Sequence, residues 1–427
     1  MAALLGPLAA VLHVVLRYGV NFPFADQWDF IAFFAAQEAG ELRWRDVWAL
    51  HNEHRMVAPK LAMLGLASLT RWNIVAEMLA SVVLALASLL ILLQLAQPVL
   101  RGSGQVGRLW TMLTLSLYVF SLAQGTNRLW GWQIQWFLSL FAAVLTVALA
   151  TWSLGSVRPW AYVAGAALAA LVCQFSIASG VVAWGAGAMV LAVHPLRRRV
   201  LAPWLAAAAV ATAAFFVGNE RHNGLPSLLI ARDHPLLLLE YVGNYLSGPL
   251  GRHAAIGLVV GLAFVGLVPI AASRHRERPD LFMPWIALGL FAGANAVLTA
   301  IGRVGMGAEQ GLVARYATIA PLMTVSVVLL GILAFRAWPS GRLTALTPVG
   351  AVAGGALLAL PAIVADVRGM ADLKEVNRRI VAGRTCVLAI DTAPDPCLVR
   401  LRPDPAVVRL RAPQLKALGL SGFASKR

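Results

Sequence analysis

Charge is scarce in this chain of 427 residues. Only 13% of the residues are charged, whereas 59% are hydrophobic and the mean hydropathy is +0.75. Soluble domains are nearer one quarter charged and one half apolar, so the composition excludes a soluble enzyme and a disordered chain. Cysteine is also scarce, with three residues, which excludes a secreted disulfide scaffold. The composition indicates a polytopic membrane protein.

Acidic residues are the scarcer kind of charge. The chain has 19 Asp and Glu against 35 Lys and Arg, which gives a net charge of +16. In a soluble protein this excess would point to nucleic acid. In a membrane protein cytoplasmic loops collect Lys and Arg. We therefore expect the excess of basic residues to indicate which loops are cytoplasmic, and we predict no nucleic-acid partner.

Long apolar runs are what the chain has in abundance. A run of about 20 residues crosses the hydrocarbon of a bilayer, and such runs predict an all-α polytopic protein with about 11 transmembrane helices in a domain over 1–365. They are expected at 2–20, 75–97, 109–123, 134–154, 160–176, 180–194, 201–217, 254–272, 282–301, 316–335 and 344–364.

The short loops predict the orientation. Alternate loops carry 11 basic residues against the acids Glu277 and Asp280, which marks their side as cytoplasmic. These basic residues are Arg101, Arg108, Arg158, Arg197, Arg198, Arg199, Arg274, Arg276, Arg278, Arg336 and Arg342. A first outer loop, 21–74, and a small C-terminal segment, 366–427, then lie on the opposite side. The apolar stretch 56–70 is too short to span comfortably, so we expect a helix along the outer interface.

The C-terminal segment holds two of the cysteines, Cys386 and Cys397. The residues 387–390 and 398–401 read as short strands around a Pro-rich turn. A disulfide would close this hairpin in an oxidising compartment, and the alternative is two free thiols. The segment is net positive, so it suits either anionic headgroups or a solvated cap.

The first outer loop is the richest in titratable groups. It opens on Asp26-Gln-Trp-Asp29, continues through an amphipathic stretch at 30–41, and reaches His51, Glu53, His54 and Arg55. A carboxylate near a membrane surface can act as a general base, because we expect partial burial to raise its pKa toward neutral. Asp26 and Asp29 are the candidate catalytic residues. His51 and His54 lie three apart, as on one helix face.

These groups also suit a divalent cation. Carboxylate oxygens favour Mg²⁺ or Mn²⁺, and imidazole suits Mn²⁺ or Zn²⁺. The candidate cofactor is therefore a divalent metal, Mg²⁺ or Mn²⁺, and the four residues from His51 to Arg55 named above line its region. The alternative is structural: either Asp caps the following helix, or the acids pair with Arg43, Arg45 or Arg55.

Two further outer loops add candidates. Trp130, Gln133 and Gln135 are candidates for a sugar cavity, because indoles and amides suit sugar hydroxyls and an amide that enters an apolar span needs partners. The alternative for Trp130 is the interfacial aromatic belt. In the Gly-rich loop 302–315, Arg303 and Arg315, with Tyr316 beside them, are placed to bind a phosphate. The alternative is that Arg315 snorkels to the interface.

At these residues the chain resembles the bacterial polytopic glycosyltransferases of the GT-C superfamily. The resemblance rests on the acidic pair after the first span, on HNEHR (51–55), on RLWGWQIQW (128–136) and on GLVARYATIAP (311–321). It implies an inner-membrane enzyme whose active face is periplasmic. A polyprenyl-phosphate-linked sugar would be the donor, and a cell-envelope glycan or lipid would be the acceptor. Asp26 would be the base of an inverting transfer.

Other readings stay open at this point. A transporter or flippase would place ionisable residues near the middle of spans. A polysaccharide polymerase or ligase would also work at the outer leaflet, and a non-catalytic assembly partner would retain a decayed site.

Overall fold

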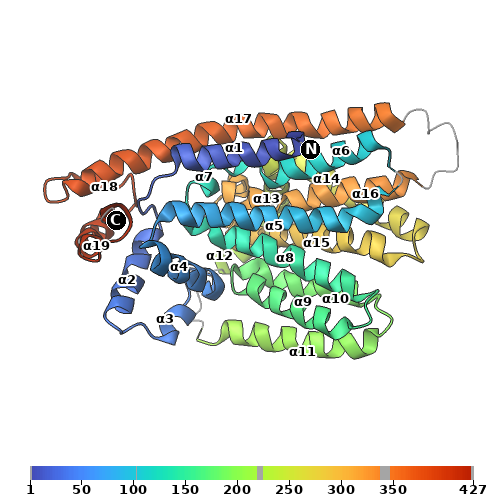
Figure 1. Cartoon of the computed structure of the whole chain (residues 1–427), viewed down its shortest axis with the longest axis horizontal. Coiled ribbons are helices and arrows are strands. Elements are labelled where there is room, and N and C mark those ends of the chain that lie inside the picture. The colour runs from blue at the N-terminus through green and yellow to red at the C-terminus, as the bar shows by residue number, and fades with distance from the viewer. Residues whose placement is uncertain (1, 102, 219–224, 337–346, 425–427) are drawn as a thin grey trace.

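The structure, a computed structural model, describes residues 2–101, 103–218, 225–336 and 347–424, and in these ranges it is all-helical. The longer helices run along the long axis of the molecule (Figure 1). Their order is α1 (Ala2–Tyr18), α2 (Gln27–Glu38), α3 (Trp44–Trp48), α4 (Val57–Thr70), α5 (Ile74–Leu100), α6 (Gln105–Val119), α7 (Gly125–Arg128), α8 (Ile134–Ser153), α9 (Pro159–Gln174), α10 (Val182–Leu191), α11 (Arg197–Phe216), α12 (Leu225–Asp233), α13 (Pro235–Ser247), α14 (Ala254–Arg274), α15 (Pro279–Arg303), α16 (Pro321–Arg336), α17 (Thr347–Leu388), α18 (Asp395–Leu398) and α19 (Pro405–Ala417).

Seven segments in the described ranges are long and apolar enough to cross a membrane. They are Ile74–Leu100, Gln105–Arg128, Gly131–Ser153, Arg199–Phe216, Ala254–Arg274, Pro279–Met306 and Ala314–Phe335. Three more of the expected spans form shorter apolar helices, at Leu5–Tyr18, Pro159–Gln174 and Ala178–Leu191. The last expected span, 344–364, begins outside the described residues and continues into α17. The prediction of an all-α, multi-span membrane protein is thus confirmed, with seven candidate spans.

The surface of the bundle is apolar where a membrane would surround it. Most of α8 is buried in the middle of the bundle, whereas α11 and α14 turn most of their surface outward. Leu262 and Val265 on α14 are 71% and 66% exposed. Such an apolar surface is unfavourable in water and suits lipid.

Aromatic side chains fasten the first outer loop to the bundle. Trp28, Phe30 and Phe34 on α2 are buried. The ring of Phe30 meets Trp132 at 5.7 Å and the ring of Phe34 meets Trp72 at 4.6 Å, measured between centroids. Each such aromatic residue removes a large apolar area from water, which stabilises the docked loop. The stretch 56–70 forms a helix as expected, α4.

The C-terminal tail returns to the first loop instead of forming a separate hairpin. The expected strands at 387–390 and 398–401 are wrong: α17 continues to Leu388, and Leu398 ends the short helix α18. Short apolar stretches of four residues fit the end of a helix or a turn as well as a strand. Cys386 and Cys397 form a disulfide between α17 and α18. Beyond it, α19 packs against α2.

Close backbone contact holds α17 in place. At Gly369, an added Cβ would lie 1.7 Å from the carbonyl oxygen of Leu122, and at Gly125 it would lie 2.3 Å from the carbonyl oxygen of Gly369. Any side chain at these two positions would hold the helix away. The amide of Asn377, two turns further on, donates to the carbonyl of Tyr18 at 2.7 Å. The helix is continuous across residue 365, where the sequence suggested a domain boundary.

Candidate functional site

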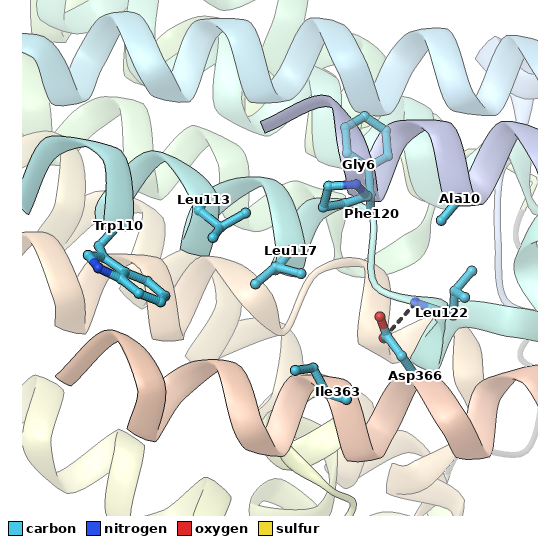
Figure 2. Close-up of a pocket in the computed structure, with 10 residues that line it drawn as sticks. Gly6, Ala10, Trp110, Leu113, Leu117, Phe120, Leu122, Ile363 and Asp366 are labelled. Carbon is cyan, nitrogen blue, oxygen red and sulfur yellow. Dashed lines mark hydrogen bonds between the residues drawn. The ribbon is translucent and has the colours of Figure 1, made fainter. Parts of the chain in front are cut away.

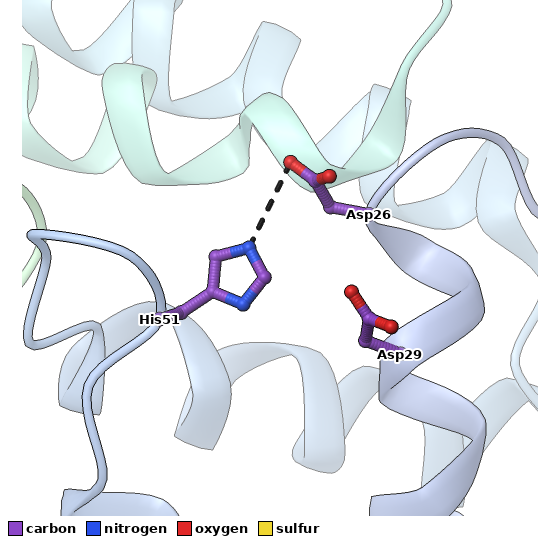
Figure 3. A group of neighbouring side chains, drawn as sticks. All are labelled: Asp26, Asp29 and His51. Atoms are coloured by element: carbon purple, nitrogen blue, oxygen red, sulfur yellow. Dashed lines mark ion pairs between the residues drawn. The ribbon is translucent and has the colours of Figure 1, made fainter. Parts of the chain in front are cut away.

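Two carboxylates and one imidazole converge at one end of the bundle. Asp26 immediately precedes α2, and Asp29 follows on its first turn (Figure 3). His51 approaches from the loop between α3 and α4. One ligand atom from each residue lies within 4.8 Å of the other two. The structure thus brings together three of the residues that the sequence pointed to.

A buried polar network holds the start of α2. The Gln27 amide donates to Glu77 Oε2 at 2.9 Å, and its carbonyl accepts from the Phe24 N–H at 3.2 Å. The Trp72 indole donates to the other oxygen of Glu77, also at 2.9 Å. Glu77 is 1% exposed. Because buried polar groups are costly to leave unpaired, this network fixes the position of the first residues of α2 and therefore of Asp26.

Asp26 does not cap α2. It occupies the N-cap position with helical backbone angles, and its side chain makes no capping hydrogen bond. Its Oδ2 lies 3.7 Å from His51 Nε2. That separation is longer than a hydrogen bond, and Nε2 is buried with no hydrogen-bond partner in the described part of the chain. The two groups therefore face one another across a gap.

The loop that carries His51 is a tight turn and not a helix. His51 and His54 exchange backbone hydrogen bonds of 2.9 Å and 3.0 Å, and Asn52 between them has a φ of 51°. The expectation that the two imidazoles share a helix face is therefore wrong. The ring of Trp132 packs edge-on against His51, with centroids 4.8 Å apart, and orients it toward the acids.

His54 turns away from the acidic pair. Its Nδ1 accepts the Ala178 N–H at 3.0 Å, so His54 joins this turn to the segment that follows α9. Burial lowers the pKa of His54 to about 3, and the nearby charges of Arg315 and His51 act in the same direction. The imidazole is therefore neutral at physiological pH.

The pKa of Asp26 shifts in the direction opposite to the one expected. Burial alone raises it, but the facing His51 and the guanidiniums of Arg402 and Arg315 together outweigh burial and lower it. Positive neighbours favour the ionised form. Asp26 is thus a carboxylate, not a neutral acid, over the physiological range.

Arg402 is a member of this site that the sequence did not suggest. It lies in the C-terminal tail between α18 and α19, and it donates to Asp29 Oδ2 at 2.9 Å and to the Ala25 carbonyl at 3.3 Å. The expected partners of the acids were Arg43, Arg45 and Arg55. Nothing in the local pattern of the tail shows that residue 402 returns to residue 29. The positive charge of the tail was the available signal.

Two arginines lie at the same end of the bundle, Arg303 as the last residue of α15 and Arg315 in the segment that follows it. Arg303 forms an ion pair with Glu53. Arg315 lies over the Tyr316 ring, 5.6 Å from its centroid, and its Nε is buried without a partner in the described residues. Its charge acts on both Asp26 and His54. Tyr316 stacks on Tyr245 at 4.8 Å, which fixes this turn against α13.

Arg55 is placed elsewhere. Its guanidinium donates to the carbonyls of Phe215, Trp48 and Val217, and the side chain is 1% exposed. Those three bonds tie the end of α3 to the end of α11. Arg55 is therefore a structural link and is not turned toward the acids.

The proposed sugar-cavity residues differ in whether their polar atoms have partners. The Trp130 indole donates to the Phe24 carbonyl at 3.0 Å and so supports the segment before Asp26. Gln133 and Gln135 are 2% and 5% exposed, and their side-chain oxygens have no hydrogen-bond partner in the described ranges. A buried unpaired acceptor is costly, so these two oxygens are suited to a bound hydroxyl or water.

A separate pocket of about 480 Å³ lies on the flank of the bundle, between α1, α6 and α17 (Figure 2). Its charged lining residue, Asp366, accepts hydrogen bonds from Ser121 Oγ at 2.7 Å and from the Leu122 N–H at 2.8 Å. The remaining lining is mainly apolar, and comprises Gly6, Pro7, Ala10, Trp110, Leu113, Leu117, Phe120, Leu122 and Ile363. Such a lining suits an alkyl chain better than a sugar.

The donor set at Asp26, Asp29 and His51 fits a divalent cation. Two carboxylate oxygens and one imidazole nitrogen match the preferences of Mn²⁺, and Mg²⁺ accepts the same oxygens. The unpartnered Nε2 of His51 faces the acids, as a ligand atom would. Among the His, Cys, Asp and Glu side chains of the described ranges, these three have ligand atoms that lie close enough together to hold one ion.

Comparison with known proteins does not extend these observations. No family model matches the chain, and no curated protein or solved structure shows significant similarity to it. The fold defines a helical, multi-span membrane protein. The site adds a cluster of carboxylates, imidazole and guanidiniums at one end of the bundle.

Proposed function

We propose that this protein is an integral-membrane glycosyltransferase that moves a sugar from a polyprenyl-phosphate donor to a cell-envelope glycan or lipid. The observation that supports this best is the convergence of three distant segments. The first loop supplies Asp26 and Asp29, the loop after α15 supplies Arg315, and the tail supplies Arg402. Carboxylates beside guanidiniums suit a reaction that removes a proton and releases a phosphate.

The proposed step is an inverting displacement. The acceptor hydroxyl gives its proton to Asp26 while its oxygen bonds to the anomeric carbon, and the bond from that carbon to the phosphate oxygen breaks. Negative charge then grows on the departing polyprenyl phosphate. In this scheme Arg315, whose Nε is unpartnered in the described residues, and Arg303, which is paired with Glu53, stabilise that charge. The lowered pKa keeps Asp26 ionised and ready to accept a proton, although it makes Asp26 a weaker base.

Asp26, Asp29 and His51 would hold a divalent cation in this scheme. A bound Mg²⁺ or Mn²⁺ would supply positive charge that stabilises a phosphate leaving group. The guanidiniums of Arg303 and Arg315 supply positive charge independently of any ion.

The topology proposed for this function has eleven crossings and a periplasmic active face. The seven candidate spans are joined by α1, α9, α10 and α17, while α4 lies along the interface. An odd number of spans between the first loop and the tail would put them on opposite sides of the membrane. This scheme has an even number between them, so both lie on the same side. The Ala25 N–H donates to the Leu401 carbonyl at 2.7 Å, which is consistent with that arrangement.

The distribution of charge favours this function over transport. A transporter needs ionisable groups along its path through the membrane. Glu77 lies in the first turn of α5, and Arg128 ends its candidate span. Both therefore lie at the ends of spans. The apolar flank pocket is a suitable place for the prenyl chain of the donor.

The test is transfer by the purified full-length protein. It is incubated with polyprenyl-phosphate hexoses and pentoses and an envelope lipid extract, and release of polyprenyl phosphate is measured. Asp26→Asn removes the proton acceptor, and the expected loss of rate is about 100-fold or more. Glu41→Gln, an exposed change in the same loop, serves as the control. Undiminished release by a correctly inserted Asp26→Asn protein contradicts the base assignment.

A further inference from the structure

The cation site already contains a positive group from the protein itself. Arg402 holds Asp29 Oδ2 at 2.9 Å, and Asp29 also contributes a ligand atom to the trio with Asp26 and His51. The Arg402 side chain is 20% exposed, so solvent screens this pair only in part. Its Nε is buried and has no partner in the described residues. The hydrogen bonds that hold the guanidinium are those to Asp29 and to the Ala25 carbonyl.

The position of Arg402 follows from how the tail docks. The neighbouring Leu401 carbonyl accepts from the Ala25 N–H at 2.7 Å, and the Ser421 N–H donates to the Arg71 carbonyl at 3.0 Å. The disulfide between Cys386 and Cys397 closes the turn that precedes Arg402. Contacts on both sides of residue 402 therefore bring a tail residue to the first loop.

We propose that Arg402 is an internal competitor for a divalent cation at Asp26, Asp29 and His51. This inference rests on the cation site of the proposed function and not on the transfer reaction. A guanidinium and a divalent ion repel one another, and both draw on the oxygens of Asp29. Cation binding therefore requires Arg402 to move away from Asp29, and the energy of breaking this ion pair weakens binding of the cation. The tail thereby sets the cation affinity of a site in the first loop.

The affinity for Mn²⁺ tests this directly. The purified full-length protein is titrated with Mn²⁺, and the electron paramagnetic resonance signal of the free ion reports binding. Arg402→Gln removes one positive charge beside the site, and we expect Mn²⁺ to bind about tenfold more tightly, the effect of a partly screened charge at short range. Arg402→Lys keeps the charge and should restore most of the wild-type affinity.

A matched control and a double variant complete the titration. Arg400→Gln removes the same charge from an exposed position two residues away and should leave the affinity unchanged. Asp29→Asn removes the shared carboxylate, so the gain from Arg402→Gln should shrink in that background. Equal or weaker Mn²⁺ binding by Arg402→Gln overturns the proposal. Absence of binding in both proteins at millimolar Mn²⁺ also overturns it, and leaves the transferase assay to be judged separately.

A measurement on the unaltered protein covers the case in which Arg402→Gln fails to fold. Coupling between two ligands is reciprocal, so an ion that displaces Arg402 makes its guanidinium more accessible. Modification of Arg402 by phenylglyoxal, followed by mass spectrometry, should become faster when Mn²⁺ is added and return to its initial rate with chelator. A rate that Mn²⁺ leaves unchanged, or slows, contradicts competition.

Discussion

At the scale of single residues, His54 shows how the site couples charge to stability. Its pKa is lowered from 6.5 to about 3, mainly by burial. Between these values the unfolded chain takes up a proton that the folded protein rejects. Above about pH 6.5, His54 is neutral in both states and costs no stability. As the pH falls toward 3, protonation of His54 in the unfolded chain lowers the free energy of unfolding, by at most about 1.4 kcal/mol per pH unit.

Thermal unfolding measured between pH 7.5 and pH 5 checks this. Wild type should lose stability on acidification, and His54→Gln should lose less, because it has no proton to take up. The exposed His234→Gln serves as the control and should follow wild type. Parallel curves for wild type and His54→Gln would show that His54 does not carry the effect.

The site residues also show what sequence can and cannot supply at this scale. Asp26, Asp29 and His51 could be found because reactive groups concentrate in one long loop. The direction of the Asp26 pKa shift could not, because it depends on how His51 faces Asp26 and on Arg402 and Arg315, which come from distant parts of the chain. No local pattern encodes such contacts. Arg55 illustrates the reverse error, because its bonding is set by the end of α11.

At the scale of elements, α17 passes the turn at 122–124 at Gly369, and among the described glycines this position leaves the least room for a side chain. A Cβ at Gly369 would lie 1.7 Å from the Leu122 carbonyl oxygen, so the backbone must move. Gly369→Ala should lower the free energy of unfolding by about 1–3 kcal/mol, the usual cost of overpacking. Thermal unfolding in detergent measures it.

A glycine in open surroundings provides the control for that substitution. Gly266 on α14 has no atom within 4 Å of an added Cβ. Gly266→Ala should therefore be neutral or slightly stabilising, since alanine favours helix more than glycine does. Equal losses at the two positions would show that the crossing is not tightly packed.

The elements themselves were predictable where hydrophobicity was strong. Long apolar runs gave α5, α8, α14 and α15 close to their observed bounds, because a span of hydrocarbon dictates both length and composition. The tail was less predictable. Its short apolar stretches at 387–390 and 398–401 fit strands or helices equally well, and in the structure they lie where α17 and α18 pack against each other.

At the scale of the whole molecule, the tail and the first loop lie together at one end of the bundle. Their contact requires both to be on the same side of a membrane. The loop that joins α8 to α9 follows a helix leading away from that end, so it lies at the other end (Figure 1). The basic residues of the short loops predict that this loop is cytoplasmic, and on that prediction the candidate site is periplasmic.

Labelling of single introduced cysteines in intact cells tests this orientation. Thr392→Cys lies on the exposed surface of the tail, and Val157→Cys lies at the opposite end, where Val157 is 97% exposed. Cys173 is buried, and the disulfide occupies Cys386 and Cys397, so the background reactivity should be low. A membrane-impermeant maleimide should label Thr392→Cys in intact cells and Val157→Cys only after the membrane is opened. The reverse pattern would place the acidic cluster in the cytoplasm, where a donor in the outer leaflet could not reach it, and would contradict the proposed function together with the orientation.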